Sequence, residues 1–127
     1  MVPRYSEEEL WTRLLAVLAH REQINSLTGR EFHRVVRIRH SERAYEIEYE
    51  SGNRPKPISL EDLAALYREL YEVGKLTNNH MGKHCKRILG WSSWHAPGSA
   101  MMAILPLIDD DIRVERGELH LKSFSPS

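Results

Sequence analysis

The sequence predicts a single α+β domain. Three observations carry this: a helical apolar pattern opens the chain, two strand-like runs follow it, and the second half holds three helix signals and a hairpin signal. A length of 127 residues suits one domain, and 41% hydrophobic with 28% charged residues is an ordinary globular composition. We divide the domain into residues 1–58, a helix plus a hairpin, and residues 59–121, a helical portion with its own hairpin.

The first predicted helix begins after Ser6. Ser6 and Glu9 have the spacing of a capping box, and apolar residues then recur at helical spacing through about Gln23. The apolar positions are Leu10, Trp11, Leu14, Leu15 and Leu18. We expect this helix to pack on the core, with Trp11 in the core or at a dimer contact.

Two strands are expected next, over residues 31–40 and 43–50. A two-residue loop at Ser41 and Glu42 gives a register in which paired numbers sum to 83. That register places Ile38 opposite Tyr45, Val36 opposite Ile47, and Arg37 opposite Glu46. Apolar residues then share one face and opposite charges the other.

The arginine-rich strand admits three interpretations. We favour a solvated sheet face whose arginines pair with glutamates across the hairpin. A phosphate-binding sheet is the alternative, and a metal-dependent nuclease built on Glu46, Glu48 and Glu50 is a more distant one.

Residues 51–57 are rich in turn-forming types and are expected to form a loop. The second helix is capped by Ser59, carries Asp62 in its first turn and stops at Gly74. Its apolar stripe is Leu60, Leu63, Leu66, Tyr67, Leu70 and Tyr71.

Residues 75–98 have the largest local charge asymmetry of the chain, since no acid lies between Glu72 and Asp109. Thr77 can cap a third helix over residues 78–89, with its basic side chains gathered on one side. Basic side chains on a helix that has no acids to pair with them favour an anionic partner. The alternative is an ordinary solvated helix face, which can have the same basic side chains. The predicted nucleic-acid-binding residues are His80, Lys83, His84, Lys86, Arg87, Trp91, Trp94 and His95.

Other interpretations of this segment remain open. Trp91 and Trp94 could stack on unpaired bases or fill the core beneath their loop. His80 and His84 have zinc-ligand spacing, but Lys83 on the same face would repel a divalent cation. We therefore predict neither a metal nor a cofactor.

A fourth helix is predicted over residues 98–105. Its stretch Ala100 to Leu105 is apolar all round and should be buried, with Pro106 ending the helix. The acidic triplet 109–111 is expected to form a solvated turn rather than a metal site. Residues 112–121 predict a hairpin about Arg116 and Gly117, with Ile112, Val114, Leu119 and Leu121 on one face, and residues 122–127 a frayed tail.

The order of helices 59–73, 78–89 and 98–105 and hairpin 112–121 resembles a winged-helix unit, with Gly74-Lys75-Leu76-Thr77 as the turn before its second helix. The resemblance implies nucleic-acid binding. Because the helix 98–105 offers no polar side chains to a groove, contact would come from the basic helix and the tryptophan loop, to backbone or unstacked bases.

Residues 26–110 also resemble a small uncharacterised α+β module of bacterial restriction and phage-defence proteins. The matching stretches are Thr28-Gly29-Arg30-Glu31-Phe32, Gly74-Lys75-Leu76-Thr77 and Ser99-Ala100-Met101-Met102-Ala103-Ile104-Leu105. That pattern usually has Ser-Tyr where this chain has Ser99-Ala100. The resemblance implies an accessory DNA-interaction module without a catalytic centre of its own.

The expected function is therefore a non-catalytic nucleic-acid-binding accessory module. The alternative is a protein-interaction or homo-oligomerisation module that assembles through Trp11, Tyr67, Tyr71 or the tryptophan loop. An enzyme is least expected, since no nucleophile, base and orienting group cluster in sequence. A single cysteine, a start without an apolar signal core and no bilayer-length apolar run favour a cytoplasmic protein without membrane contact.

Overall fold

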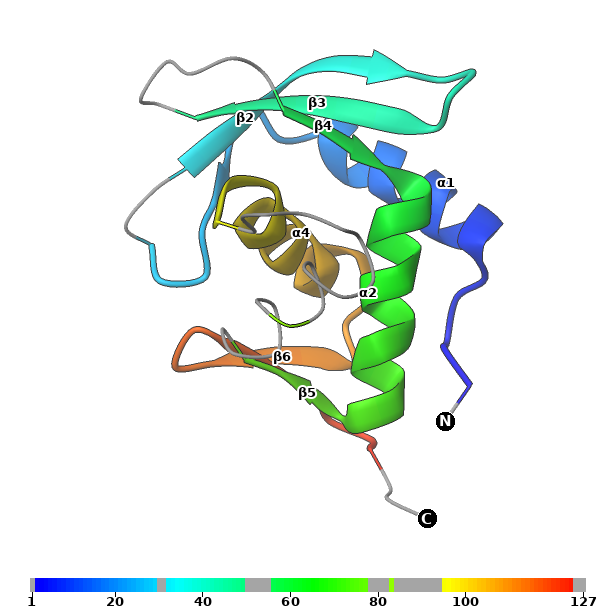
Figure 1. Cartoon of the computed structure of the whole chain (residues 1–127), viewed down its shortest axis with the longest axis vertical. Coiled ribbons are helices and arrows are strands. Elements are labelled where there is room, and N and C mark those ends of the chain that lie inside the picture. The colour runs from blue at the N-terminus through cyan, green and yellow to red at the C-terminus, as the bar shows by residue number, and fades with distance from the viewer. Residues whose placement is uncertain (1, 30–31, 50–55, 78–82, 84–94, 125–127) are drawn as a thin grey trace.

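The computed structural model describes residues 2–29, 32–49, 56–77, 83 and 95–124 (Figure 1). The chain has the predicted α+β fold, with helices and two antiparallel sheets. The elements are α1 (Glu7–Ala19), β1 (Ile24–Asn25), β2 (Phe32–Arg39), β3 (Ala44–Tyr49), β4 (Lys56–Ser59), α2 (Leu60–Val73), β5 (Lys75–Leu76), α4 (His95–Ile108), β6 (Ile112–Glu115) and β7 (Glu118–Leu121).

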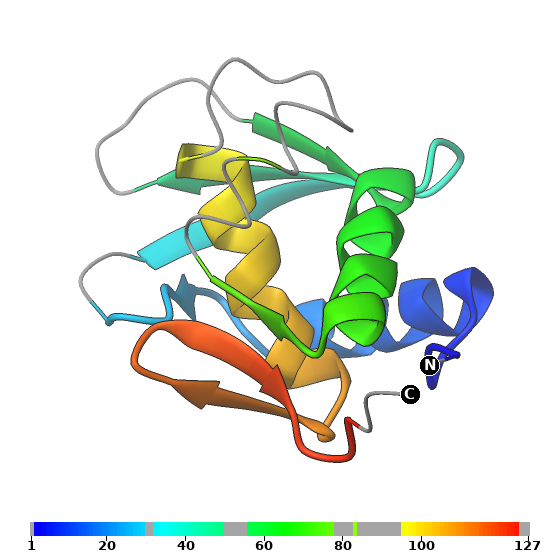
Figure 2. The same cartoon turned by 60° about the horizontal axis from the view of Figure 1, so that its bottom comes forward.

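The two sheets lie at opposite ends of the molecule with α4 between them (Figures 1 and 2). The first sheet has the order β1-β2-β3-β4 and the second the order β5-β7-β6. Helix α2 runs along the side from β4 to β5 and so joins the sheets, while α1 packs against α2 and α4. Among the described helices, none combines the length and apolar character that crossing a membrane requires.

Helix α4 forms the centre of the core, as its composition predicts. Residues Ala100 to Leu105 are at most 4% exposed. The helix starts earlier than predicted, at His95, and the prediction that Pro106 ends it is wrong because it runs on to Ile108. Pro106 has no backbone N–H, so the helix lacks one donor near its end. The chain still closes a helical hydrogen bond after it, because the Asp109 amide donates to the Leu105 carbonyl at 3.0 Å.

The hairpin β2–β3 has the predicted register only near its turn. Ile38 pairs with Tyr45 and Arg37 with Glu46, but a bulge at Val36 then makes Val35, and not Val36, the partner of Ile47. Strict alternation from Ile38 would have turned Arg34 toward the core. The bulge instead buries His33 and leaves Arg34 and Val36 exposed.

The predicted loop 51–57 is wrong at its end, because Lys56–Ser59 forms β4 and pairs with β3. Pro57 is tolerated there because β4 is an edge strand. Its outer side has no neighbouring strand, so a proline without a backbone N–H removes no hydrogen bond on that side. Residues 51–55 lie outside the described part of the chain.

Both predicted helix caps are confirmed. In α1, Ser6 and Glu9 form the capping box, although the helix ends at Ala19 and not near Gln23. In α2, the Asp62 amide donates to the Ser59 hydroxyl at 3.1 Å, and Gly74 ends the helix with a φ of 84°. That left-handed conformation suits glycine and turns the chain into β5.

The C-terminal hairpin turns at Arg116 and Gly117 as predicted, both with positive φ. Val114 lies at the exposed end of this hairpin and is 45% exposed, in contrast to its buried neighbours on the same face. The prediction of a frayed tail is wrong for residues 122–124. The Lys122 amide bonds the Asp111 carbonyl at 2.8 Å, and Phe124 packs so close to Gly74 that an added Cβ would meet its ring at 2.5 Å.

Candidate nucleic-acid interface

The structure describes two of the eight predicted contact residues. Lys83 is helical and exposed, and no described carboxylate forms an ion pair with it. His95 is the first residue of α4. The other predicted contact residues are outside the described part of the chain: His80, His84, Lys86, Arg87, Trp91 and Trp94.

The outer face of the second sheet adds cations that the sequence interpretation did not include. Strand pairing places Lys75, His120 and Arg113 in one row across β5, β7 and β6. Arg116 at the turn and Lys122 after β7 are also exposed. Two glutamates share this face: Glu115 lies 3.1 Å from the Arg113 guanidinium, and Glu118 lies 3.4 Å from Nε2 of His120. Cationic groups therefore outnumber carboxylates there.

The acidic side chains that follow the basic segment in sequence are engaged elsewhere. Arg4 pairs with Asp110 and reaches Asp109 at 3.4 Å. Asp111 accepts a hydrogen bond from the Ser123 hydroxyl. In α1, Glu8 pairs with Arg43, so these acids do not cover Lys83 within the described residues.

Asp109 corrects the prediction of a solvated acidic turn. The prediction fits Asp110, whose side chain is 85% exposed, but Asp109 is fully buried. Its carboxylate accepts hydrogen bonds at 2.7 Å from the hydroxyls of Tyr67 and Tyr71, and at 2.9 Å from the Asp111 amide. A signal was present in the sequence: two tyrosines one helical turn apart on a buried stripe need a hydroxyl partner.

The pKa values of this cluster are set by burial and by these hydrogen bonds. Burial by itself would raise the pKa of Asp109, but the two tyrosine hydroxyls, the Asp111 amide and Arg4 together hold it below its usual range. Burial, followed by the bond to Asp109, raises the pKa of Tyr71 to about 12 and that of Tyr67 further. At neutral pH the carboxylate is therefore charged and both phenols keep their protons, an arrangement that joins α2, the end of α4 and the N-terminal segment.

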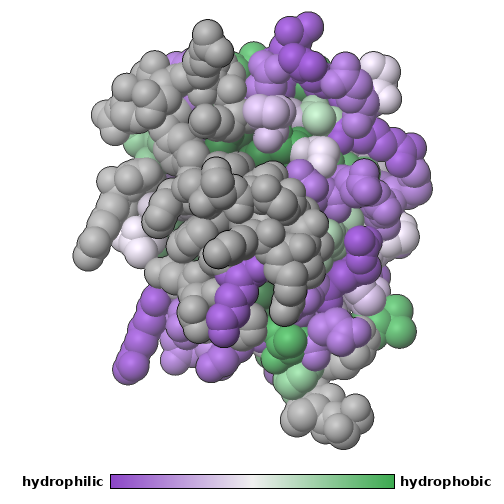
Figure 3. Space-filling view, in the orientation of Figure 1, coloured by the Kyte–Doolittle hydropathy of each residue, from purple (hydrophilic) through white to green (hydrophobic). Residues whose placement is uncertain are grey.

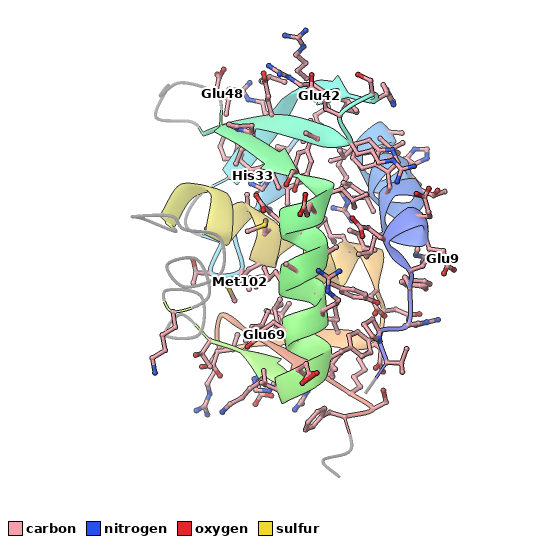
Figure 4. The ribbon with its side chains drawn as sticks, turned by 45° about the vertical axis from the view of Figure 1, so that its right-hand side comes forward. Glu9, His33, Glu42, Glu48, Glu69 and Met102 are labelled. Atoms are coloured by element: carbon pink, nitrogen blue, oxygen red, sulfur yellow. The ribbon has the colours of Figure 1, made fainter. Side chains whose placement is uncertain are left out.

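The first sheet keeps its outer charges close to balance. Arg39 pairs with Glu42 and Glu46, and its contact with Glu46 is one of the expected arginine–glutamate pairs across the hairpin. Glu42 and Glu48 lie on the side of the sheet away from the helices, whereas His33 lies between sheet and helices (Figure 4). The Arg34 guanidinium lies 5.9 Å from the centre of the Phe32 ring. The described residues of this face show no excess of positive charge comparable to that of the second sheet.

Three aromatic residues that the sequence offered as assembly contacts are in the core. Trp11 is 8% exposed, Tyr67 1% and Tyr71 3%, so these three side chains pack within the chain. Where residues are described, the surface over α2 is largely hydrophilic (Figure 3).

No group of three or more metal-ligating side chains comes together within the described residues. Comparison of the chain with family models, with curated proteins and with solved structures finds no match in any of the three.

Proposed function

We propose that this chain is a non-catalytic nucleic-acid-binding accessory module whose residues 59–121 form a winged-helix-like unit. The supporting observation is connectivity. Helix α2 leads through β5 into the segment that contains Lys83, α4 and the hairpin β6–β7 follow, and β5 pairs with β7. Strand β5, which follows α2, thus joins the C-terminal hairpin in one sheet, as a single winged unit requires.

The distribution of charge supports an anionic partner. Lys83 and the exposed cations of the second sheet belong to this unit, while Asp109, Asp110 and Glu8 pair with arginines elsewhere. A surface on which lysines and arginines outnumber carboxylates attracts phosphates and releases counterions on binding.

The burial of α4 supports a contact that does not read sequence. Base-specific recognition in a groove needs side chains that reach base edges. Ala100 to Leu105 are apolar and packed in the core, so this stretch of α4 offers none. The cations of the unit would therefore bind the phosphate backbone, and the tryptophan loop would be the part that contacts unstacked bases.

The test is a salt titration of binding to fluorescent duplex and single-stranded oligonucleotides, read by anisotropy. We expect the logarithm of the binding constant to fall linearly with the logarithm of salt concentration. The double variant Lys83→Glu, Arg87→Glu should weaken binding by roughly tenfold or more. It should also reduce the magnitude of the slope of this plot by about two. Arg87 lies outside the described residues and is included on the sequence evidence.

Arg68→Glu is the matched control, because Arg68 is equally exposed but belongs to α2 and lines a hollow beside the N-terminal segment. It should change binding little. Absence of binding to either oligonucleotide at low salt, or an equal loss in Arg68→Glu, would contradict the proposal. Circular dichroism of each variant checks that the fold is retained.

A further inference from the structure

Strand β6 forms one edge of the second sheet. The sheet has the order β5-β7-β6, so β7 covers one side of β6, and no described strand pairs with the other side. Figure 2 shows β6 at the margin of the molecule, with β7 between it and β5. The residues from Arg113 to Glu115 are all exposed. An exposed strand edge offers its backbone groups to a further strand.

The hydrogen bonds of β7 show which residues of β6 direct their backbone outward. The Lys122 amide donates to the Asp111 carbonyl at 2.8 Å, so Lys122 bonds toward β6. The preceding residue, Leu121, bonds toward β5, since its amide donates to the Gly74 carbonyl at 3.0 Å. Bonding sides alternate along an antiparallel ladder, and every second residue of β6 therefore directs its N–H and C=O away from β7.

These outward-directed residues of β6 are Ile112 and Val114. The Ile112 amide is already used, because it donates to the Asp109 carbonyl at 3.2 Å. Val114 presents both its N–H and its C=O. Val114 pairs with Leu119, which is fully buried, yet Val114 itself is 45% exposed. The edge thus presents an apolar side chain and a pair of backbone groups at the same residue.

The outer face of β6 carries one arginine and one glutamate. Arg113 and Glu115 lie on either side of Val114, their side chains 54% and 50% exposed, and they contact each other at 3.1 Å. A strand that pairs antiparallel with β6 about Val114 is best matched if it has a glutamate opposite Arg113 and an arginine opposite Glu115. It should also have an apolar residue opposite Val114. The stretch Arg113-Val114-Glu115, run in the opposite direction, meets all three requirements.

We propose that β6 pairs antiparallel with β6 of a second copy of this chain, about a two-fold axis at Val114. Two backbone hydrogen bonds join Val114 of one copy to Val114 of the other, and the two valine side chains cover each other. Arg113 of each copy lies opposite Glu115 of the other, and every contact occurs twice. The Arg113–Glu115 contact within each copy is kept, so the charges alternate in sign around the axis. The second sheets of the two copies become one continuous sheet.

Charge selects this register over its neighbours. Moving the axis to Arg113 or to Glu115 places two arginines or two glutamates directly opposite each other, which is destabilising. A parallel pairing in register does the same. Moving the axis to Ile112 requires the Ile112 amide, which already donates to Asp109. The axis at Val114 avoids both conflicts.

The expected dimer is weak. A strand of four residues makes a small interface, at or below the lower limit of about 1,200 Å² for stable specific complexes. The charge pairs are solvent-exposed and are screened by salt. Dimerisation therefore requires high protein concentration and low ionic strength. It does not depend on nucleic-acid binding.

The first test traps the dimer with a disulfide. All variants carry Cys85→Ser, which removes the single cysteine of the chain. Val114→Cys then places two thiols at the axis, where the Cα atoms of a hydrogen-bonded pair lie about 5.5 Å apart, within the range of a disulfide. The matched control is Val36→Cys, because Val36 is 47% exposed and lies on β2. In a glutathione redox buffer, Val114→Cys should crosslink roughly tenfold faster or more, since pairing raises the effective thiol concentration. Equal rates overturn the proposal.

The second test reverses charges and measures the sedimentation of the full chain in low salt, at concentrations up to about 1 mM, where millimolar dissociation constants are detected. Arg113→Glu and Glu115→Arg should each be monomeric alone where the wild type dimerises, because each sets like charges opposite each other. An equimolar mixture of the two variants should dimerise, since every contact then joins opposite charges. Arg34→Glu is the control, because Arg34 is exposed on the first sheet, and it should dimerise like the wild type.

Three outcomes of the sedimentation experiment overturn the proposal. One is a mixture that stays monomeric, and another is a wild-type dimer that both charge variants preserve. The third is a wild type that stays monomeric at the highest concentration, which would leave this edge to an extended peptide of another protein. Misfolding of a variant cannot produce the expected result, because mixing two misfolded chains would not restore the dimer.

Discussion

Among the described residues, two side chains that titrate below pH 7 are almost fully buried, and the protein keeps them in opposite charge states. His33 lies beneath the first sheet and is 2% exposed, whereas Asp109 lies between α4 and β6 and is fully buried. Burial lowers the pKa of His33 to about 4, so its imidazole is neutral at pH 7. Asp109 stays ionised, even though burial alone opposes its charge, because four groups donate to its carboxylate or attract it.

The difference follows from what surrounds each group. A buried ionisable group loses the solvation of its charge, and it either gives up that charge or finds replacement donors in the protein. Tyr67 and Tyr71 from α2 supply such donors to Asp109, together with the Asp111 amide and Arg4. For His33, burial lowers the pKa of the imidazole, which is therefore neutral.

The largest expected effect comes from removing the buried charge. Asp109→Ala leaves two tyrosine hydroxyls and the Asp111 amide without their acceptor, and should lower the free energy of unfolding by about 3–5 kcal/mol. Urea unfolding at pH 7 measures it. The neighbouring Asp110→Ala is the control and should change stability little, since its side chain is 85% exposed. Equal effects of the two substitutions would contradict the contrast between the buried and the exposed aspartate.

The pH dependence of stability separates the two buried groups. The folded-state pKa of His33 is depressed, so the unfolded chain binds more protons between pH 6.5 and about 4, and stability is lost as the pH falls through this window. The loss from this residue should approach about 3 kcal/mol at pH 4, from 1.36 kcal/mol per pKa unit. We expect His33→Gln to remove most of that slope, measured by urea unfolding at pH 7, 5.5 and 4.

Asp109 acts in a lower window. Its folded-state pKa is also depressed, so its contribution is present above the ordinary value of 3.8 and is lost as the pH falls below it. The difference in the free energy of unfolding between the wild type and Asp109→Ala should therefore stay constant down to about pH 4 and become smaller below that pH. A difference that already disappears between pH 6 and 5 would show that the carboxylate is not ionised in the folded state.

Removing single donors should have smaller effects. Tyr67→Phe and Tyr71→Phe each delete one hydrogen bond to a charged group and should cost about 1–3 kcal/mol. Tyr67→Phe also removes the acceptor of the Tyr5 amide, which donates to the Tyr67 hydroxyl at 3.3 Å. In the Asp109→Ala background both substitutions should cost less than in the wild type. Full additivity in this double-mutant cycle would contradict the coupling of the two tyrosines to Asp109.

The smallest effect is expected for Arg4→Gln. The Arg4 side chain is 47% exposed, and water screens its attraction to Asp109 and Asp110. Stability should change little, and raising the salt concentration should reduce the change further. A loss as large as that of Tyr67→Phe would mean that the arginine, and not the tyrosines, keeps Asp109 charged.

Much of the fold could be predicted because its signals are local. The capping box at Ser6, the Ser59 cap and the Gly74 stop of α2, and the turn at Arg116 each depend on a few neighbouring residues, and all are confirmed. The burial of α4 follows from its composition. For the candidate site, the basic segment and the exposed position of Lys83 could be proposed from sequence, whereas the cationic row across the second sheet depends on strand pairing.

What the sequence determined by itself is therefore helices α1, α2 and α4, the two hairpins and the apolar centre, since propensity, capping and periodicity act over one or two turns of chain. Tertiary structure alone decided three other features. The bulge at Val36 depends on which strand residues must face the core, and β4 forms because β3 offers it an edge. Asp109 is buried and charged only because Tyr67 and Tyr71 meet it across some 40 residues of chain. Contacts between distant segments decide these features, and no local pattern encodes the distance between two such segments.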